Sequence, residues 1–235
     1  MSEPPRPIRF FAVALKPSRS LRVALLALVA FALWIAWTEP TEVEQTLVLA
    51  LVFQMFAAAN GYQERAVRGH FDPILAVGRS RPSIAAAHWA LSIAPGVVAW
   101  LLLTAIVFLV RPSEWPASFT ASGLAAFAYV SCLAWALALP LTRYASGVVW
   151  IMVLFLLAGG RQLDALREAY AMAGSGWTHV LARAGAAMVC PIFLLANPNA
   201  AGSIALLLVL LVAALCTIGG AFFIATLDIP LRDPT

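Results

Sequence analysis

Six uncharged and mainly apolar runs divide the sequence, and most of them approach the length of a membrane crossing. They cover Val23–Trp37, Thr46–Tyr62, Trp89–Val110, Phe119–Thr142, Gly147–Gly160 and Ala201–Leu227. A helical crossing takes about 20 apolar residues, and a bilayer core offers no water to satisfy an open backbone. The short fifth run can be extended by Arg143 and Tyr144 at the interface. The runs predict an all-α polytopic membrane protein with six transmembrane helices.

The composition agrees with this assignment. The chain has 235 residues, of which 63% are hydrophobic and 11% are charged. In a soluble domain, roughly a quarter of the residues are charged. Six crossings use roughly 120 residues, which leaves too few for a separate soluble domain. We therefore expect a single transmembrane domain over residues 1–235, embedded in the lipid bilayer.

Basic residues set the expected orientation. With the amino terminus in the cytoplasm, eleven of the 15 basic residues fall on the inner side and four on the outer side. The inner set is Arg6, Arg9, Lys16, Arg19, Arg22, Arg65, Arg68, Arg79, Arg81, Arg143 and Arg232, and the outer set is Arg111, Arg161, Arg167 and Arg183. The positive-inside rule therefore places both termini in the cytoplasm. Because the basic residues form no single solvated stripe, no nucleic-acid partner is expected.

Three segments lie outside the predicted spans. Residues 1–20 mix apolar and basic side chains and predict an amphipathic helix on the inner membrane surface, ended by Pro17. Residues 63–88 form an inner loop, far longer than a turn between adjacent helices needs. Residues 161–200 form an outer stretch that includes Ala186–Ala196, an apolar piece broken by Pro191 and expected to be re-entrant or interfacial.

The sequence lacks the residues that several classes of function require. The six runs contain no Asp, Glu, Lys, Arg or His, which argues against a self-contained ion-coupled transporter. The sequence has no P-loop and no H-E-x-x-H motif, and its three cysteines have no metal-site spacing. We expect no catalytic residue, no metal site and no enzyme activity in this chain. One alternative is an intramembrane hydrolase using Ser175 and His179, although Gly174-Ser175-Gly176 is more typical of a turn before an interfacial helix.

The inner loop has the most ordered pattern outside the runs. A charged start with Glu64 and Arg68 is followed by Gly69, then by an amphipathic piece that Asp72 could cap, and then by a basic pair. One interpretation is a small helix that presents Phe71 and Ile74 to a partner. The other is a lipid-facing turn held on anionic headgroups by Arg79 and Arg81. The pattern alone leaves both open.

This loop resembles the loop after the second span in the ABC-2 type transporter permease family. The resemblance rests on Glu64, Gly69, the run Phe71-Asp72-Pro73-Ile74-Leu75 and the run Gly78-Arg79-Ser80-Arg81. In that family an acid and a Gly precede a short apolar element, and a small residue with Arg leads into the next helix. The chain departs from the family pattern at His70, where a Thr is common, and at Asp72-Pro73. The layout of six spans with an amphipathic start also resembles that family.

The resemblance implies a division of labour. Such permeases export their cargo as pairs and rest on separately encoded cytoplasmic P-loop ATPase subunits, which bind the ATP and Mg. This chain would then need no cofactor of its own, would pair with an identical or related permease, and would lie in a bacterial-type inner membrane. The implied ATPase-coupling residues are Glu64, Arg65, Arg68, Gly69, Phe71, Asp72, Pro73, Ile74, Arg79 and Arg81.

By the same analogy, the second and fifth spans line the substrate path. The residues implied on the second span are Phe53, Gln54, Met55 and Asn60. The alternative is that Gln54 and Asn60 only form hydrogen bonds between helices. An uncharged interior favours a hydrophobic or amphipathic cargo, and the sequence identifies no particular one. A second hypothesis, from another class, is a membrane scaffold or assembly factor that docks a partner through the inner loop without transport.

Overall fold

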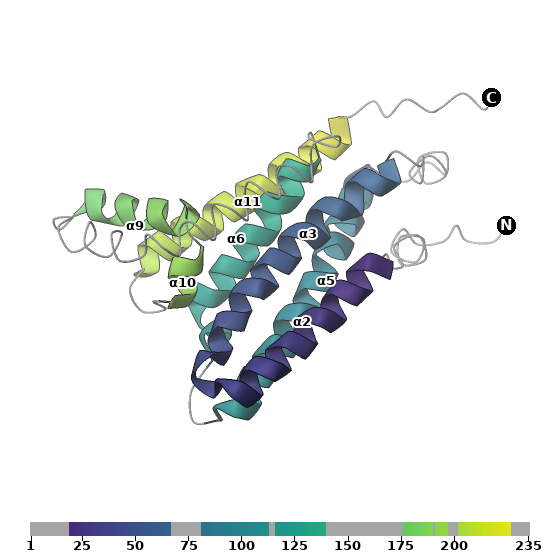
Figure 1. The fold of residues 1–235 in the computed structure, drawn as a ribbon. Coiled ribbons are helices and arrows are strands. Elements are labelled where there is room, and N and C mark those ends of the chain that lie inside the picture. The colour runs from purple at the N-terminus through teal and green to yellow at the C-terminus, as the bar shows by residue number, and fades with distance from the viewer. Residues whose placement is uncertain are drawn as a thin grey trace.

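The structure is a computed structural model that describes residues 19–66, 81–112, 116–139, 176–189, 191–196 and 202–226. The secondary structure of these residues is entirely helical. The long helices are α2 (Arg19–Thr38), α3 (Thr46–Ala66), α5 (Arg81–Val110), α6 (Ala121–Ala138) and α11 (Ser203–Thr226). The shorter helices are η1 (Pro40–Gln45), η2 (Ala117–Phe119), α9 (Trp177–Val189) and α10 (Ile192–Ala196). The long helices run side by side as a bundle (Figure 1).

Four helices form the centre of the bundle, with α5 and α6 opposite each other. α3 packs against both α5 and α6, and α11 also packs against both, whereas α5 and α6 touch each other little. α2 lies outside this group, mainly against α5. The main apolar core lies between the central helices and includes Leu51, Leu103 and Trp135.

Local signals explain where several helices begin or bend. The hydroxyl of Thr120 accepts a hydrogen bond from the backbone N–H of Gly123 at 3.1 Å and so caps α6. A Cβ on Gly123 would overlap the carbonyl oxygen of Ala117, so the η2 turn can approach α6 only at a glycine. α5 contains Pro95, which has no N–H to donate to the carbonyl of Leu91 and which favours a bend there.

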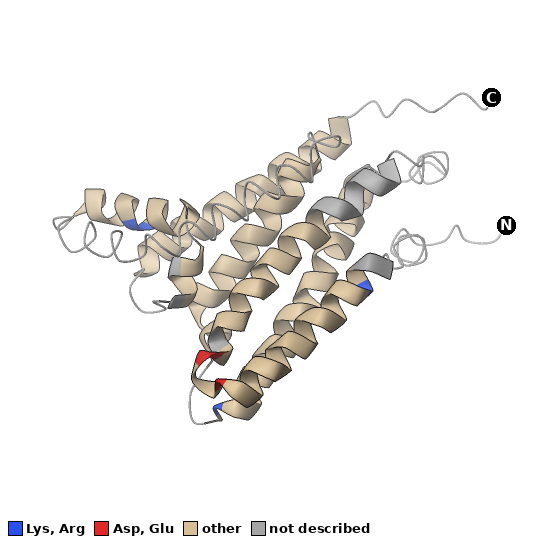
Figure 2. Ribbon diagram, in the orientation of Figure 1, with Lys and Arg blue, Asp and Glu red and all other residues tan. Residues whose placement is uncertain are grey.

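The helix ends fall into two groups. The start of α2, the end of α3, the start of α5 and the ends of α6 and α11 lie at one end of the bundle, called here the α11-exit end (Figure 1). The η1 turn, η2, α9 and α10 lie at the opposite end. Among the described residues, charged side chains stand near these ends or on α9, and the helix bodies between them are uncharged (Figure 2).

Four of the described helices are long and apolar enough to cross a membrane: Leu21–Thr38, Pro82–Val110, Ala121–Ala138 and Ser203–Thr226. α3, which ends in a polar turn, is not among them. All-helical structure is therefore confirmed for the described residues, and several apolar helices are compatible with a multi-pass membrane protein. The predicted fifth run, Gly147–Gly160, lies outside the described residues, and six spans stay a prediction.

The structure changes the bounds of two predicted segments. The inner loop is shorter than the predicted residues 63–88, because residues 63–66 close α3 and residues 81–88 open α5. In the outer stretch, residues 177–189 and 192–196 are helical, and the interruption falls beside the buried Pro191. The predicted surface helix over residues 1–20 lies outside the described residues except for Arg19 and Ser20, which begin α2.

Candidate functional site

α5 carries a row of buried residues at every fourth position, which we call the α5 row. The row consists of His88, Ser92, Gly96, Trp100 and Thr104. Each step advances about 6 Å along the helix, so the row is about 24 Å long, compared with a thickness of about 30 Å for the hydrocarbon core of a bilayer. Each step also turns about 40°, so the row winds around α5 and meets different neighbours along its length.

At the α11-exit end of the row, His88 is hydrogen-bonded to a tryptophan of the opposite helix. Trp135 on α6 donates its indole N–H to Nδ1 of His88 at 2.9 Å, and neither side chain is exposed. Because Nδ1 accepts this bond it carries no proton, so the imidazole is neutral. Since α5 and α6 face each other across the bundle, this bond crosses its centre.

Trp135 also fixes the position of α11. A Cβ added to Gly220 on α11 would overlap the six-membered part of the Trp135 indole. The ring therefore fills the space that Gly220 leaves open. His88, Trp135 and Gly220 connect α5, α6 and α11 in one continuous contact.

In the middle of the row, α3 inserts a polar side chain against a glycine. The amide of Gln54 occupies the place that a side chain at Gly96 would take. Gln54 is completely buried, and neither amide atom has a hydrogen-bond partner among the described residues. A buried polar group left without a partner costs about 1–3 kcal/mol.

Two serines extend the polar surface between α5 and α6. Ser92 follows His88 by one helical turn, and Ser131 precedes Trp135 by one turn. Because α5 and α6 are antiparallel, both serines lie at the same level, about 6 Å further into the bundle. Both are buried, and within the described part of the chain neither hydroxyl has a hydrogen-bond partner.

At the η1 end of the row, a hydroxyl pair ties α5 to η2. The hydroxyl of Thr104 donates to the carbonyl of Trp100 at 2.6 Å and shares a hydrogen bond with the hydroxyl of Ser118 at 2.8 Å. Both hydroxyl residues are buried. Trp100 packs on Phe127 of α6 with the ring centroids 5.0 Å apart, and its indole N–H has no partner among the described residues.

The chemistry of the row is that of neutral hydrogen-bonding groups. Its members and their neighbours Gln54, Ser131 and Trp135 include an amide, hydroxyls, indoles and a neutral imidazole. In the described ranges no three His, Cys, Asp or Glu side chains gather closely enough to hold a metal ion. The row can therefore donate to and accept from an uncharged polar group.

The predicted path residues are placed in part. Phe53, Gln54 and Met55 are all buried, and Gln54 faces α5. Phe53 packs with Ala57 of α3 and Ala99 of α5. Asn60 lies in α3, and the structure does not describe its side chain.

The predicted coupling residues lie at or beyond the edge of the described structure. Glu64 and Arg65 belong to the last turn of α3, and Arg81 is the first residue of α5, all at the α11-exit end. Their side chains are not described. Arg68, Gly69, Phe71, Asp72, Pro73, Ile74 and Arg79 lie outside the described residues. Of the hydrolase pair, Ser175 is also outside, and His179 lies in the first turn of α9.

Sequence reasoning missed the α5 row, and it left His88, the first member of the row, outside the predicted spans. The predicted third span began at Trp89, which left His88 in a loop, whereas the membrane-length part of α5 runs from Pro82 to Val110 and contains His88. The absence of Asp, Glu, Lys, Arg and His from the spans, used above against ion coupling, therefore does not hold for α5, which contains His88. The regular spacing of four residues from His88 to Thr104 was the available signal.

Comparison of the chain with protein-family models, with curated proteins and with solved structures found no match.

Proposed function

We propose that this chain is the membrane-spanning permease subunit of an ABC-2 type transporter, driven by a separate cytoplasmic ATPase and exporting a hydrophobic or amphipathic substrate. The observation that carries the proposal is the pairing of the two helices that flank the predicted coupling loop. α3 and α5 pack along each other, and Gln54 is seated against Gly96. A partner that moves the loop would move this pair, and with it the centre of the bundle.

The arrangement of helix ends supports the proposed topology. The start of α2 and the end of α11 lie at the same end of the bundle, which fits termini on one side of a membrane (Figure 1). α6 ends at the α11-exit end, whereas α9 and α10 lie at the other end. The predicted fifth span falls in the sequence between these elements, where one further crossing fits.

The charged residues support the proposed orientation. Arg22 lies near the α11-exit end, and Glu39, Glu42 and Arg111 lie near the η1 end (Figure 2). The positive-inside rule assigns Arg22 to the inner side and Arg111 to the outer side, and these two residues lie near opposite ends of the bundle. The loop between α3 and α5 would then face the cytoplasm, where an ATPase can reach it.

The test is to separate ATP hydrolysis from export. Phe71→Ala and Arg68→Glu should abolish export in vesicles reconstituted with the partner ATPase, while membrane insertion stays normal. Phe31→Ala is the matched control, because Phe31 is 43% exposed on α2 and is not part of the predicted coupling loop. Unchanged export and unchanged ATPase stimulation in both loop variants would overturn the coupling assignment.

Purification of the tagged chain from its own membranes tests the partner itself. A P-loop ATPase that co-purifies with the chain, and is lost with Arg68→Glu, supports the permease assignment. A chain that purifies without any ATPase and leaves export unchanged when deleted would instead be a scaffold or assembly factor.

A further inference from the structure

We propose that the α5 row, with Gln54 and Ser131 facing it, is the intramembrane binding site for an uncharged hydrogen-bonding group, a hydroxyl or an amide, carried by an amphipathic molecule. The inference rests on the proposed function and names the substrate chemistry and the site. Its basis is the set of buried polar atoms that lack hydrogen-bond partners among the described residues. On these faces they are Nε2 and Oε1 of Gln54, Oγ of Ser92, Nε1 of Trp100 and Oγ of Ser131.

These atoms are concentrated where helices of the bundle meet. Gln54, Ser92, Trp100 and Ser131 are each at most 3% exposed. Native interiors satisfy nearly all such groups, and each exception calls for an explanation, such as a bound molecule. Alanine or leucine at these positions would pack without any polar atom to satisfy. The presence of these polar atoms in the α5 row and on the residues that face it therefore points to a ligand that forms hydrogen bonds with them.

The row selects against charged ligands. It offers both donors and acceptors but no formal charge, and its one imidazole is neutral because Nδ1 accepts the Trp135 N–H. A charged group would be desolvated here without a counter-charge, whereas a hydroxyl or an amide can donate and accept. The indole faces of Trp100 and Trp135 add flat apolar surface beside the polar atoms, which suits an amphipathic molecule.

The site is closed in this structure, and Pro95 gives α5 a point at which it can bend and open the site. The amide of Gln54 fills the notch at Gly96, so α3 covers the middle of the row. Pro95 stands immediately before that glycine and interrupts the backbone hydrogen bonds of α5. Bending at Pro95 moves Gly96 away from Gln54 and brings Ser92 and Trp100 into contact with whatever enters between α3 and α5.

Cysteine accessibility in membranes tests the inference. Ser92→Cys and Ser131→Cys each change one atom, and Ala126→Cys is the matched control. Ala126 is completely buried on α6, on the side of that helix opposite to Trp135, and it lies as far from the midpoint of α6 as Ser92 does from that of α5. A thiol reacts with a methanethiosulfonate reagent as the thiolate, which requires a polar surrounding. We expect the cysteines at positions 92 and 131 to react at least about tenfold faster than Ala126→Cys.

Two matched amphiphiles identify the ligand class. Dodecyl maltoside has an uncharged hydroxylated head, and dodecyltrimethylammonium has a cationic head on the same alkyl chain. We expect dodecyl maltoside to abolish modification of Ser92→Cys and the cationic amphiphile to leave it unchanged. Equal reactivity of all three cysteines, or no protection by dodecyl maltoside, overturns the site. The absence of a co-purifying ATPase would overturn the proposed function. The reaction rates of the cysteines do not depend on that result, so the two failures can be told apart.

Discussion

α2 and α6 each contain a membrane-length stretch of 18 residues, yet the two stretches occupy opposite environments. Only 6% of the α2 stretch is buried within the protein, compared with 61% of the α6 stretch. The exposed side chains of α2 are large and apolar, such as Leu26 and Phe31, whereas α6 buries small residues such as Gly123 and Ala126. Small residues let helices approach closely, and large apolar ones suit contact with lipid. Apolarity therefore marks both helices as membrane-length, and the small residues of α6 favour its close packing inside the bundle.

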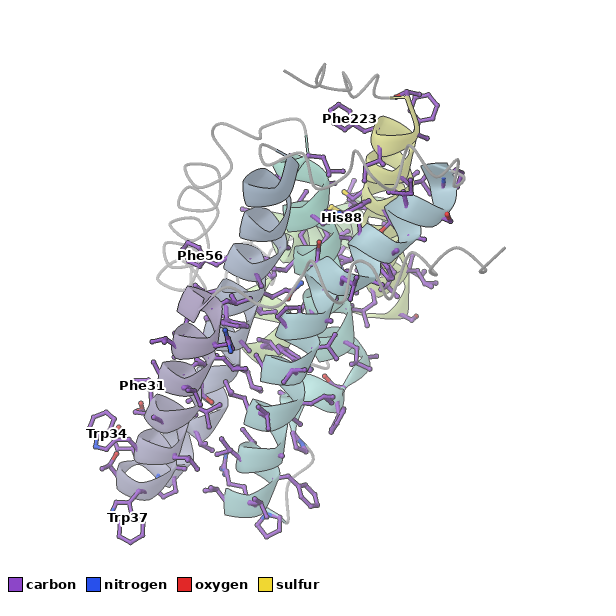
Figure 3. The ribbon with its side chains drawn as sticks, turned by 90° about the vertical axis from the view of Figure 1, so that its right-hand side faces the viewer. Phe31, Trp34, Trp37, Phe56, His88 and Phe223 are labelled. Atoms are coloured by element: carbon purple, nitrogen blue, oxygen red, sulfur yellow. The ribbon has the colours of Figure 1, made fainter. Side chains whose placement is uncertain are left out.

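Tryptophan makes the same distinction. Trp34 and Trp37 project outward from the end of α2 (Figure 3) and are 58% and 88% exposed. Trp135 on α6 is completely buried, and its N–H is bonded to His88. A tryptophan at a helix end typically lies at a membrane–water interface, whereas a buried one needs a partner for its N–H. The following variants test this contrast, from the largest expected effect to the smallest.

The packing of α6 on α11 predicts the largest effect. Gly220→Val places two methyl groups and a Cβ into the Trp135 ring, and overpacking of this kind costs about 1–3 kcal/mol. We expect a loss near the upper limit, measured as the free energy of unfolding in mixed micelles. Gly219→Val is the matched control, because a Cβ at Gly219 meets nothing within 4 Å. Equal losses in both variants would show that Trp135 does not hold α11.

The contact between α3 and α5 predicts the next effect. Gly96→Ala sets a methyl group against the Gln54 amide, and we expect a net loss of about 1–2 kcal/mol after the gain in helix propensity. Adding Gln54→Ala removes the obstacle. The double variant should therefore be more stable than the sum of the two single changes by about 1 kcal/mol or more. Strict additivity in this double-mutant cycle would contradict the contact.

The hydrogen bond across the bundle centre predicts a smaller effect. Trp135→Phe keeps an aromatic ring but removes the N–H that His88 accepts, and we expect a loss of about 1 kcal/mol. The same exchange on the outer helix, Trp37→Phe, should change the free energy of unfolding by less than about 0.5 kcal/mol. A result in which Trp37→Phe costs as much as Trp135→Phe would remove the contrast between the two helices.

The positions of the long described helices were predictable from the uncharged apolar runs, but one important boundary was not. Uncharged runs marked α2, α3, α5, α6 and α11 because a charged side chain inside a bilayer is costly. The start of α5 was missed because the predicted span was limited to the apolar run that begins at Trp89, whereas the helix begins at Arg81 with Pro82 in its first turn. Proline is favoured there, since its missing N–H would be unbonded anyway.

The partners in the candidate site were beyond prediction for a different reason. Gln54 was a candidate path residue by analogy with the ABC-2 permease family, as a polar residue of the second predicted span. Its contact with Gly96, and that of Trp135 with Gly220, join residues 42 and 85 positions apart. Such pairs depend on which helices become neighbours, and no local spacing encodes that choice. The coupling residues stay a prediction, since most of them lie outside the described residues.

We expect the smallest effect from Leu26→Ala, which tests the contrast between α2 and α6 on the exposed helix α2. Leu26 is 70% exposed, so in a membrane its side chain contacts lipid in the folded protein. Lipid surrounds it equally when the helices separate, so truncation should change the free energy of unfolding by less than about 0.5 kcal/mol. Gly220→Val in the same micelles shows that the assay detects lost packing. A loss above about 1 kcal/mol for Leu26→Ala would mean that protein covers this face, most simply a second copy of this chain, and α2 would then belong to an interface.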